Sequence, residues 1–111
     1  MAKISIVALP QFQKEIKQLS KKYISLPKDF KNLLTTLENN PTTGESLGNN
    51  CYKIRMKIAS KHAGKSGGAR VITCVKIIDS AIYLISIYDK ADRETITKKE
   101  IEGLLKSNGI I

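Results

Sequence analysis

The sequence predicts an α+β fold in which two N-terminal helices and one C-terminal helix pack on a mainly antiparallel four-stranded sheet, in the order β-α-α-β-β-β-α. Three observations predict it. Apolar residues recur at helical spacing in the first third of the chain, they alternate with basic residues from Cys51 onward, and a helix-capping signal precedes the last apolar stripe. We expect residues 1–111 to form one domain, because domains cluster at about 100–150 residues.

The N-terminal part supplies one short strand and two helices. Residues 4–8 are rich in β-branched side chains, which favours a strand. Spacings of three and four predict two apolar helical stripes, made by Phe12, Ile16, Leu19 and Tyr23 and by Phe30, Leu33, Leu34 and Leu37. Ser25 and Pro27 suit the start of the second helix, and Pro41 ends it. We expect residues 42–50 to form a loop.

The C-terminal part supplies three strands that follow one another. Alternation from residue 51 to residue 58 and apolar runs at 69–78 and 81–88 predict them. A glycine-rich loop at 60–68 and a tight turn at 79–80 separate them. Such a meander is antiparallel, and we expect the N-terminal strand to join it at an edge.

The last helix has the clearest start signal in the chain. Thr97 and Glu100 fit a capping box, and Ile96 and Ile101 fit the hydrophobic staple that often accompanies it. The sequence therefore predicts a helix that begins beside Thr97.

The charge of the chain points to a polyanionic partner. Lys and Arg number 19 and Asp and Glu number 10, so the formal net charge is +9. Nucleic acid is the first expectation, with an acidic protein or an anionic membrane as alternatives. No apolar run approaches the ~18–20 residues of a membrane span, and no secretory signal is visible, so we expect a cytoplasmic protein that does not bind membranes. Two cysteines and one histidine are too few for a tetrahedral zinc site, and we expect neither metal nor cofactor.

Basic residues concentrate on one predicted strand. Lys53, Arg55 and Lys57 recur at every second position, so they project from one face about 6.5–7 Å apart, close to the spacing of phosphates along a nucleic acid. Between Glu45 and Asp79 the sequence contains no acidic residue. The pattern favours RNA binding over the alternative, a solvated face that lysines keep soluble.

The same residues suit RNA cleavage. RNA carries its own nucleophile, the 2′-hydroxyl, so an enzyme must move protons and stabilise the charge of the phosphorane. The arginine fork matches phosphate oxygens, and lysine can transfer protons. We take Lys53, Arg55 and Arg70 as candidate catalytic residues, with Arg70 on a solvated face of the next strand. The candidate substrate-binding residues are Lys57, Lys61, Lys65, Tyr88, Lys90 and Arg93.

Two of these interpretations leave alternatives. Tyr88 suits either stacking on a base or capping the core. The charges of residues 89–94 alternate in sign, and we expect them to pair with one another or with solvent, although Lys90 and Arg93 can reach the basic face.

Three segments carry a family resemblance. They read L-G-N-N-C-Y-K-I-R at 47–55, G-K-S-G-G-A-R-V-I at 64–72 and I-Y-D-K at 87–90. Together they resemble the RelE/ParE toxin superfamily, above all its RelE/HigB-like branch. The resemblance covers nearly the whole chain and implies a RelE-like fold and the toxin of a bacterial type II toxin–antitoxin pair.

The resemblance also implies roles for residues. Lys53 and Arg55 fall where RelE-type enzymes keep two basic residues for phosphate contact and proton transfer, and Arg70 falls on their transition-state arginine. That pattern also has a second arginine and a tyrosine, where this sequence has Ala91 and Thr97.

The implied function is a ribosome-dependent mRNA interferase, a metal-independent endoribonuclease that a cognate acidic antitoxin holds inactive. Its partners are then the antitoxin, mRNA and the ribosome. One alternative is a ParE-like toxin that inhibits DNA gyrase and has no nuclease activity. Another is an RNA-binding module that does not catalyse.

Overall fold

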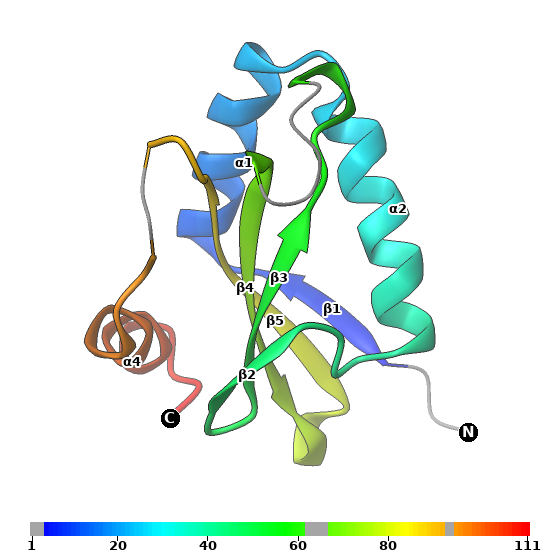
Figure 1. Ribbon diagram of the computed structural model, residues 1–111. Coiled ribbons are helices and arrows are strands. Elements are labelled where there is room, and N and C mark those ends of the chain that lie inside the picture. Colours follow the sequence, from blue (N-terminus) through cyan, green and yellow to red (C-terminus); the bar gives the residue numbers. More distant parts are fainter. Residues whose placement is uncertain (1–3, 62–66, 93–94) are drawn as a thin grey trace.

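The computed structural model describes residues 4–61, 67–92 and 95–111 (Figure 1). Its elements in chain order are β1 (Ser5–Ala8), α1 (Pro10–Lys22), α2 (Leu26–Asn39), β2 (Glu45–Gly48), β3 (Cys51–Met56), β4 (Ala69–Lys76), β5 (Ala81–Asp89) and α4 (Lys98–Ser107), with short 3₁₀ turns at Ala59–Lys61 and Ile77–Asp79. The α+β class and the three helices are as the sequence predicted.

The sheet has five strands in the order β1-β5-β4-β3-β2, one more than predicted. The N-terminal strand β1 lies at an edge, parallel to β5, and the remaining neighbours are antiparallel. The additional strand, β2, replaces part of the loop expected at 42–50. Asn49 and Asn50 both have positive φ, 52° and 62°, which is the backbone of a two-residue hairpin turn that folds β2 back on β3.

Helices cover both faces of the sheet (Figure 1). Under α1 and α2 lies a core that includes Phe12, Leu26, Leu37, Ile54, Val71, Ile82 and Ile87. On the opposite face α4 packs over a second cluster that includes Cys51, Ile72, Cys74, Tyr88, Ile101 and Leu105. Because β5 is buried from both sides, its sequence is apolar on both faces, as the pattern predicted. The part of the second face that carries Arg55 remains exposed beside α4.

A bulge in β5 sets which residues share a face. The pairing of β4 with β5 passes from Ile72 opposite Ser86 to Thr73 opposite Leu84, so Ile85 has no partner in the register. One extra residue reverses the alternation of side chains beyond it. The bulge therefore places Tyr88, and not Ile87, opposite Arg70 on the face of α4.

The predicted start of α4 is confirmed. The Thr97 hydroxyl accepts a hydrogen bond from the Glu100 backbone N–H at 3.1 Å, and the Thr97 N–H donates to Glu100 Oε1 at 3.3 Å. Ile96 and Ile101 on either side of the cap are both buried. None of the helices in the described ranges is long and apolar enough to cross a membrane.

Replacing the cap should destabilise the protein measurably. Thr97→Ala removes the side-chain acceptor for one helix N–H, so we expect a loss of about 1 kcal/mol in the free energy of unfolding. Thr97→Ser keeps an acceptor and should retain most of this stability. Urea denaturation followed by circular dichroism measures both. Equal midpoints for Thr97→Ala and the parent would contradict the role of the cap.

Candidate nucleic-acid interface

The register of the central strands places two arginines side by side. Arg55 of β3 is paired with Arg70 of β4, and Arg70 is paired with Tyr88 of β5. Directly paired residues of antiparallel strands point to the same face. Lys53 is paired with Ile72, which packs under α4, so Lys53 also lies on this face. The structure therefore brings the three candidate catalytic residues of the sequence together.

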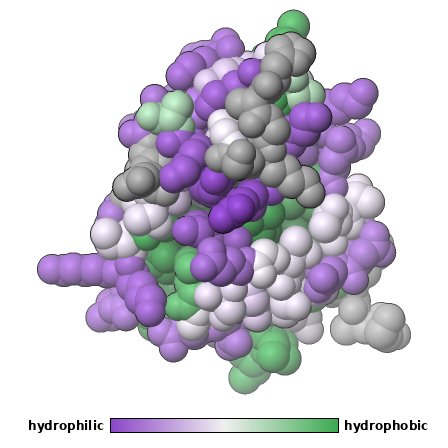
Figure 2. Space-filling model, in the orientation of Figure 1, coloured by the Kyte–Doolittle hydropathy of each residue, from purple (hydrophilic) through white to green (hydrophobic). Residues whose placement is uncertain are grey.

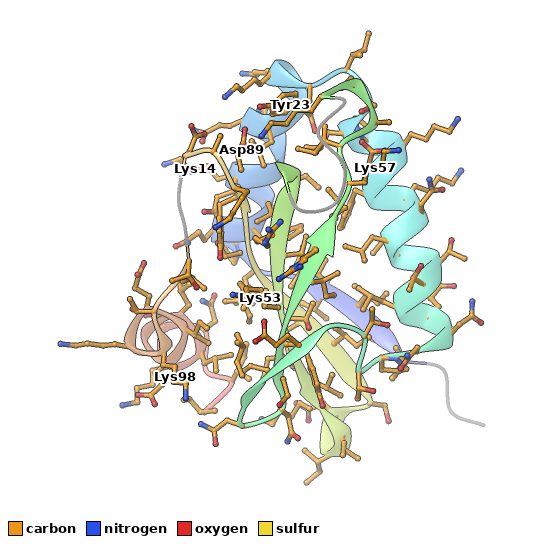
Figure 3. All side chains as sticks on the ribbon, in the orientation of Figure 1. Lys14, Tyr23, Lys53, Lys57, Asp89 and Lys98 are labelled. Carbon is orange, nitrogen blue, oxygen red and sulfur yellow. The ribbon has the colours of Figure 1, made fainter. Side chains whose placement is uncertain are left out.

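Lys53 and Arg55 lie at the surface beside α4, and Arg70 is buried next to them. Figure 3 shows Lys53 on the face of the sheet turned to the viewer, between α4 and β3. In the same orientation, hydrophilic residues gather at the centre of the surface, with hydrophobic surface on either side (Figure 2). We call the area of Lys53, Arg55 and Arg70 the basic face.

Lys53 has an acidic neighbour that the sequence did not reveal. Its Nζ lies 3.9 Å from Oε2 of Glu45, which is paired with it across β2 and β3. The Lys53 side chain is 21% exposed and that of Glu45 is 66% exposed, so the pair is weak. Glu45 stands on β2, the strand that the sequence did not predict, and offsets part of the charge of Lys53.

Arg70 is buried, which corrects the expectation that it stands on a solvated face. It is 5% exposed because it begins the central strand between β3 and β5. Its Nη1 donates a hydrogen bond to the carbonyl oxygen of Ala69 at 3.3 Å. Burial restricts the rotamers of this long side chain, so its guanidinium is ordered before a ligand arrives.

Arg55 and Lys57 are the exposed cations of this region. Neither has a hydrogen-bond or ion-pair partner among the residues that the structure describes. Both line a groove between β3 and α2, to which Asp29 and Asn32 also contribute. An anion that reaches the basic face can therefore meet Arg55 without displacing an internal partner.

Tyr88 is a core residue, and the structure decides between its two interpretations. It is 6% exposed and belongs to the cluster under α4. Its hydroxyl accepts a hydrogen bond from the backbone N–H of Ile96 at 3.2 Å. The ring caps the core beside Arg70, and stacking on a base would require it to leave this position.

Lys61 contacts a buried carboxylate. Its Nζ lies 2.6 Å from Oδ1 of Asp89, whose side chain has no exposed surface. Lys22 approaches the other oxygen at 3.5 Å, and the Tyr23 hydroxyl donates to it at 2.5 Å. The partners of Asp89 thus include residues at the end of α1 and in the turn after β3, whereas the sequence predicted pairing within residues 89–94 or with solvent. Because Lys61 forms an ion pair with Asp89, its ammonium group is already engaged inside the fold.

The partners of Asp89 keep it ionised. Burial by itself would raise the pKa of the carboxyl, but hydrogen bonds from Lys61, Tyr23 and the backbone N–H of Ala91 outweigh burial and lower the pKa to about 2, from an ordinary value of 3.8. A lowered pKa means that the carboxylate stabilises the folded state above about pH 4 and that this stability is lost as the pH falls toward 2.

Removing this charge should weaken the fold. Asp89→Asn leaves two lysines beside a neutral amide, so we expect a loss of about 3 kcal/mol at pH 7. Between about pH 4 and pH 2, protonation of Asp89 should lower the free energy of unfolding of the parent by about 2 kcal/mol, and the variant should not show this loss. Urea denaturation across this pH range provides the measurement.

Asp92→Asn is the matched control. Asp92 is 66% exposed and lies 3.9 Å from Lys22, so its replacement should change stability by less than about 0.5 kcal/mol. If the two variants unfolded at the same urea concentration, the buried cluster would not have the importance assigned to it.

The remaining predicted contacts are spread along the chain. Lys90 is half-buried, and its backbone N–H donates to the carbonyl oxygen of Gly68 at 3.0 Å, next to the start of β4. Lys65 and Arg93 lie outside the residues that the structure describes.

Ala91 and Thr97, where the family pattern has arginine and tyrosine, have structural roles here. The Ala91 N–H donates to Asp89 Oδ1 at 2.9 Å, and Thr97 caps α4. The sequence pattern placed Tyr23 only on an apolar helical stripe and did not reveal Asp89 as a buried anion. The one available signal was the acidic residue at the end of an apolar strand, in the segment I-Y-D-K.

The basic face can bind a phosphodiester from two sides. Arg70 offers an ordered guanidinium, and Arg55 offers an adaptable one, and both can donate charge-assisted hydrogen bonds to phosphate oxygens. Lys53 adds an ammonium group that can donate a proton. In the described part of the chain, no three His, Cys, Asp or Glu side chains gather where they could hold a metal ion.

Comparisons with known proteins identify the family of the chain. The family model described as the RelE toxin of the RelE/RelB toxin–antitoxin system matches residues 12–110. No curated protein matches the chain significantly.

Solved structures share the fold at low sequence identity. Escherichia coli RelE with two arginines replaced, in the free state, matches with a TM-score of 0.64 and 16% identity over 96% of this chain and 98% of that one. The isolated E. coli RelE toxin matches with a TM-score of 0.61 and 17% identity over 96% and 99%. The intact E. coli RelBE toxin–antitoxin complex matches with a TM-score of 0.60 and 20% identity over 79% and 96%. The chain belongs to the RelE toxin family of toxin–antitoxin systems.

Proposed function

We propose that this toxin is a ribosome-dependent mRNA interferase. In this reaction the 2′-hydroxyl of mRNA attacks the adjacent phosphorus, a phosphorane forms, and the bond to the 5′-oxygen breaks. The products are a 2′,3′-cyclic phosphate and a 5′-hydroxyl. The RNA supplies the nucleophile, so the protein needs only to orient the strand, stabilise charge and transfer protons.

The observation that carries the proposal is the pairing of Arg55 with Arg70 next to Lys53. Two guanidinium groups on adjacent strands can contact different oxygens of one phosphate, and the additional charge of a phosphorane strengthens both contacts. Arg70 is the better candidate for transition-state stabilisation because it is buried and ordered. Lys53 is assigned to proton transfer, and Arg55 and Lys57 to the approach of the RNA strand.

Loss of either arginine should slow cleavage. Arg70→Ala removes one preorganised donor and should lower the cleavage rate by about 10²–10³. Arg70→Lys keeps the charge without the fork and should rescue it only in part. Arg55→Ala changes an exposed side chain, so it should reduce cleavage while leaving the fold intact. Primer extension on a translated mRNA after induction, together with growth arrest, reads out all three.

Lys31→Ala is the matched control. Lys31 is an exposed cation of α2, on the opposite side of the sheet, so its loss removes the same charge without touching the basic face. Normal cleavage by both Arg55→Ala and a folded Arg70→Ala would show that the basic face is not the active site. Circular dichroism of Arg70→Ala separates a loss of chemistry from a loss of fold.

The positions of Thr97 and Tyr88 leave one part of the interferase pattern unfilled, so inhibition of DNA gyrase by binding alone is the second candidate. Thr97 caps a helix and Tyr88 is buried, so neither offers a ring to a base. Growth arrest without mRNA cleavage, combined with inhibition of gyrase supercoiling by the purified chain, would favour this candidate over the interferase.

We also propose a cognate acidic antitoxin as the partner that keeps the toxin inactive in the cytoplasm. The net charge of +9 favours a negatively charged partner, and the outer faces of α1 and α2 carry the exposed cations Lys14, Lys17, Lys21, Lys28 and Lys31. Association should be faster at low ionic strength because opposite charges steer the encounter.

The salt dependence of antitoxin binding tests this partnership. With the product of the neighbouring gene, we expect the association rate to fall at least tenfold between about 50 mM and 500 mM salt, because screening shortens the reach of the lysines. Surface plasmon resonance measures this rate. A neighbouring protein that co-purifies but binds at a rate independent of salt would contradict an electrostatic partner.

A further inference from the structure

Two cysteines lie opposite each other across β3 and β4, on the face of the sheet that α4 covers and two positions along β3 from Lys53. Cys51 begins β3 and is paired with Cys74 of β4. Both are free thiols, and they are 3% and 5% exposed. They belong to the cluster beneath α4, so the two side chains point to the same face of the sheet.

The backbone places this pair at a position that a disulfide can bridge. The neighbouring pair exchanges a hydrogen bond, from the N–H of Val75 to the carbonyl oxygen of Asn50 at 2.9 Å. Hydrogen-bonded and non-hydrogen-bonded pairs alternate along antiparallel strands, so Cys51 and Cys74 form a non-hydrogen-bonded pair. Such pairs have a Cα separation of about 4.5 Å, within the range of about 4.4–6.8 Å found for disulfides.

A small molecule can reach the two thiols. Both line a cavity of about 430 Å³ between α4 and the turn that joins β2 to β3. Leu105 and Ile111 form its apolar side, and Asn50 contributes a polar group. Exposure of the side chains is low, but a hydroperoxide fits a space of this size.

We propose that Cys51 and Cys74 are a dithiol site that a hydroperoxide oxidises to an intramolecular disulfide. Cys74 attacks the peroxide as a thiolate, the O–O bond breaks, and Cys74 becomes a sulfenic acid while hydroxide leaves and takes up a proton. The Cys51 thiol then loses its proton and attacks the sulfur of Cys74, and the sulfenic oxygen departs as water. With hydrogen peroxide, two thiols lose two electrons in total and two water molecules form.

The surroundings of the two thiols favour Cys74 for the first step. The Cys51 thiol donates a hydrogen bond to the carbonyl oxygen of Asn49 at 3.7 Å, so its proton has an acceptor in the structure. Contact with the Cys51 thiol and the charge of Lys76 lower the pKa of Cys74, although burial opposes this. Contact with Cys74, together with burial, raises the pKa of Cys51. The thiolate is the reactive form of cysteine, so Cys74 is the nucleophile and Cys51 is the resolving residue.

A disulfide between Cys51 and Cys74 would close a loop of the chain that contains the residues of the basic face. Lys53, Arg55 and Arg70 all lie in the segment between the two cysteines. A disulfide of this span restricts the unfolded chain and holds β3 against β4. Oxidation should therefore raise the melting temperature by about 10 °C and should protect the pairing of Arg55 with Arg70 from opening.

The test treats the purified chain with hydrogen peroxide and then counts free thiols by alkylation in denaturant and intact mass spectrometry. We expect a mass loss of two hydrogens, no alkylated cysteine, a monomer on a non-reducing gel and the higher melting temperature, all reversed by dithiothreitol. Two thiols that remain open to alkylation would overturn the proposal, as would disulfide-linked dimers alone. A bond that forms without raising the melting temperature would overturn the proposed clamping of the strands.

Single variants test the order of the two steps. Cys51→Ser cannot form the bond, so its Cys74 should accumulate as a sulfenic acid that dimedone traps. In Cys74→Ser, labelling by dimedone after peroxide treatment should be at least tenfold slower, because burial and the hydrogen bond to the Asn49 carbonyl oxygen still favour the protonated Cys51 thiol. The reverse order of reactivity would overturn the assignment of Cys74 as the nucleophile. Neither cysteine belongs to the basic face, so this test is independent of the outcome for RNA cleavage.

Discussion

The pairing of β3 with β4 is the interaction on which the candidate site depends. It puts Arg55 directly opposite Arg70 and places Lys53 two positions away on the same face. Because side chains alternate along a strand, a slip of one residue would turn the whole basic set into the core under α1 and α2. The apolar residues on the other face, such as Ile54 and Val71, resist this slip because they are almost completely buried. The core thus fixes the geometry of the charged face.

A buried anion complements this arrangement. The chain carries a net charge of +9, and the repulsion among its cations opposes folding. Asp89 sits at the end of β5, one residue after Tyr88, and brings Lys61 and Lys22 to a common carboxylate. These contacts tie the turn after β3 to α1 and to the end of β5, so the cluster closes the end of the sheet at which Arg70 begins its strand. The cations used inside the fold are thereby distinct from Arg55 and Lys57, which face solvent.

Local patterns predicted the helices, the meander and the cap of α4, because each depends on residues close in sequence. The sequence did not predict β2, because this strand is only four residues long. Its one local signal is the pair Asn49–Asn50 in the turn that follows, whose positive φ angles only the structure shows. The burial of Tyr88 could not be read from alternation, since the bulge at Ile85 changes the phase of β5 and no pattern marks it. Arg70 is buried because β3 and β5 flank its strand, and that arrangement of strands is set by pairing between segments distant in sequence. The partners of Asp89 are distant in sequence, so only the fold reveals that Lys61 is occupied.

The most direct test of the account is cleavage of mRNA on programmed ribosomes by the purified toxin, with the ends of the products determined. We expect a 2′,3′-cyclic phosphate upstream of the cut. We also expect that one 2′-deoxy substitution at the cleaved nucleotide abolishes cleavage, because the nucleophile is lost. Cleavage that continues on the 2′-deoxy substrate would contradict the proposed chemistry. An intact mRNA on ribosomes to which the folded toxin is bound would show that the basic face binds RNA without cutting it.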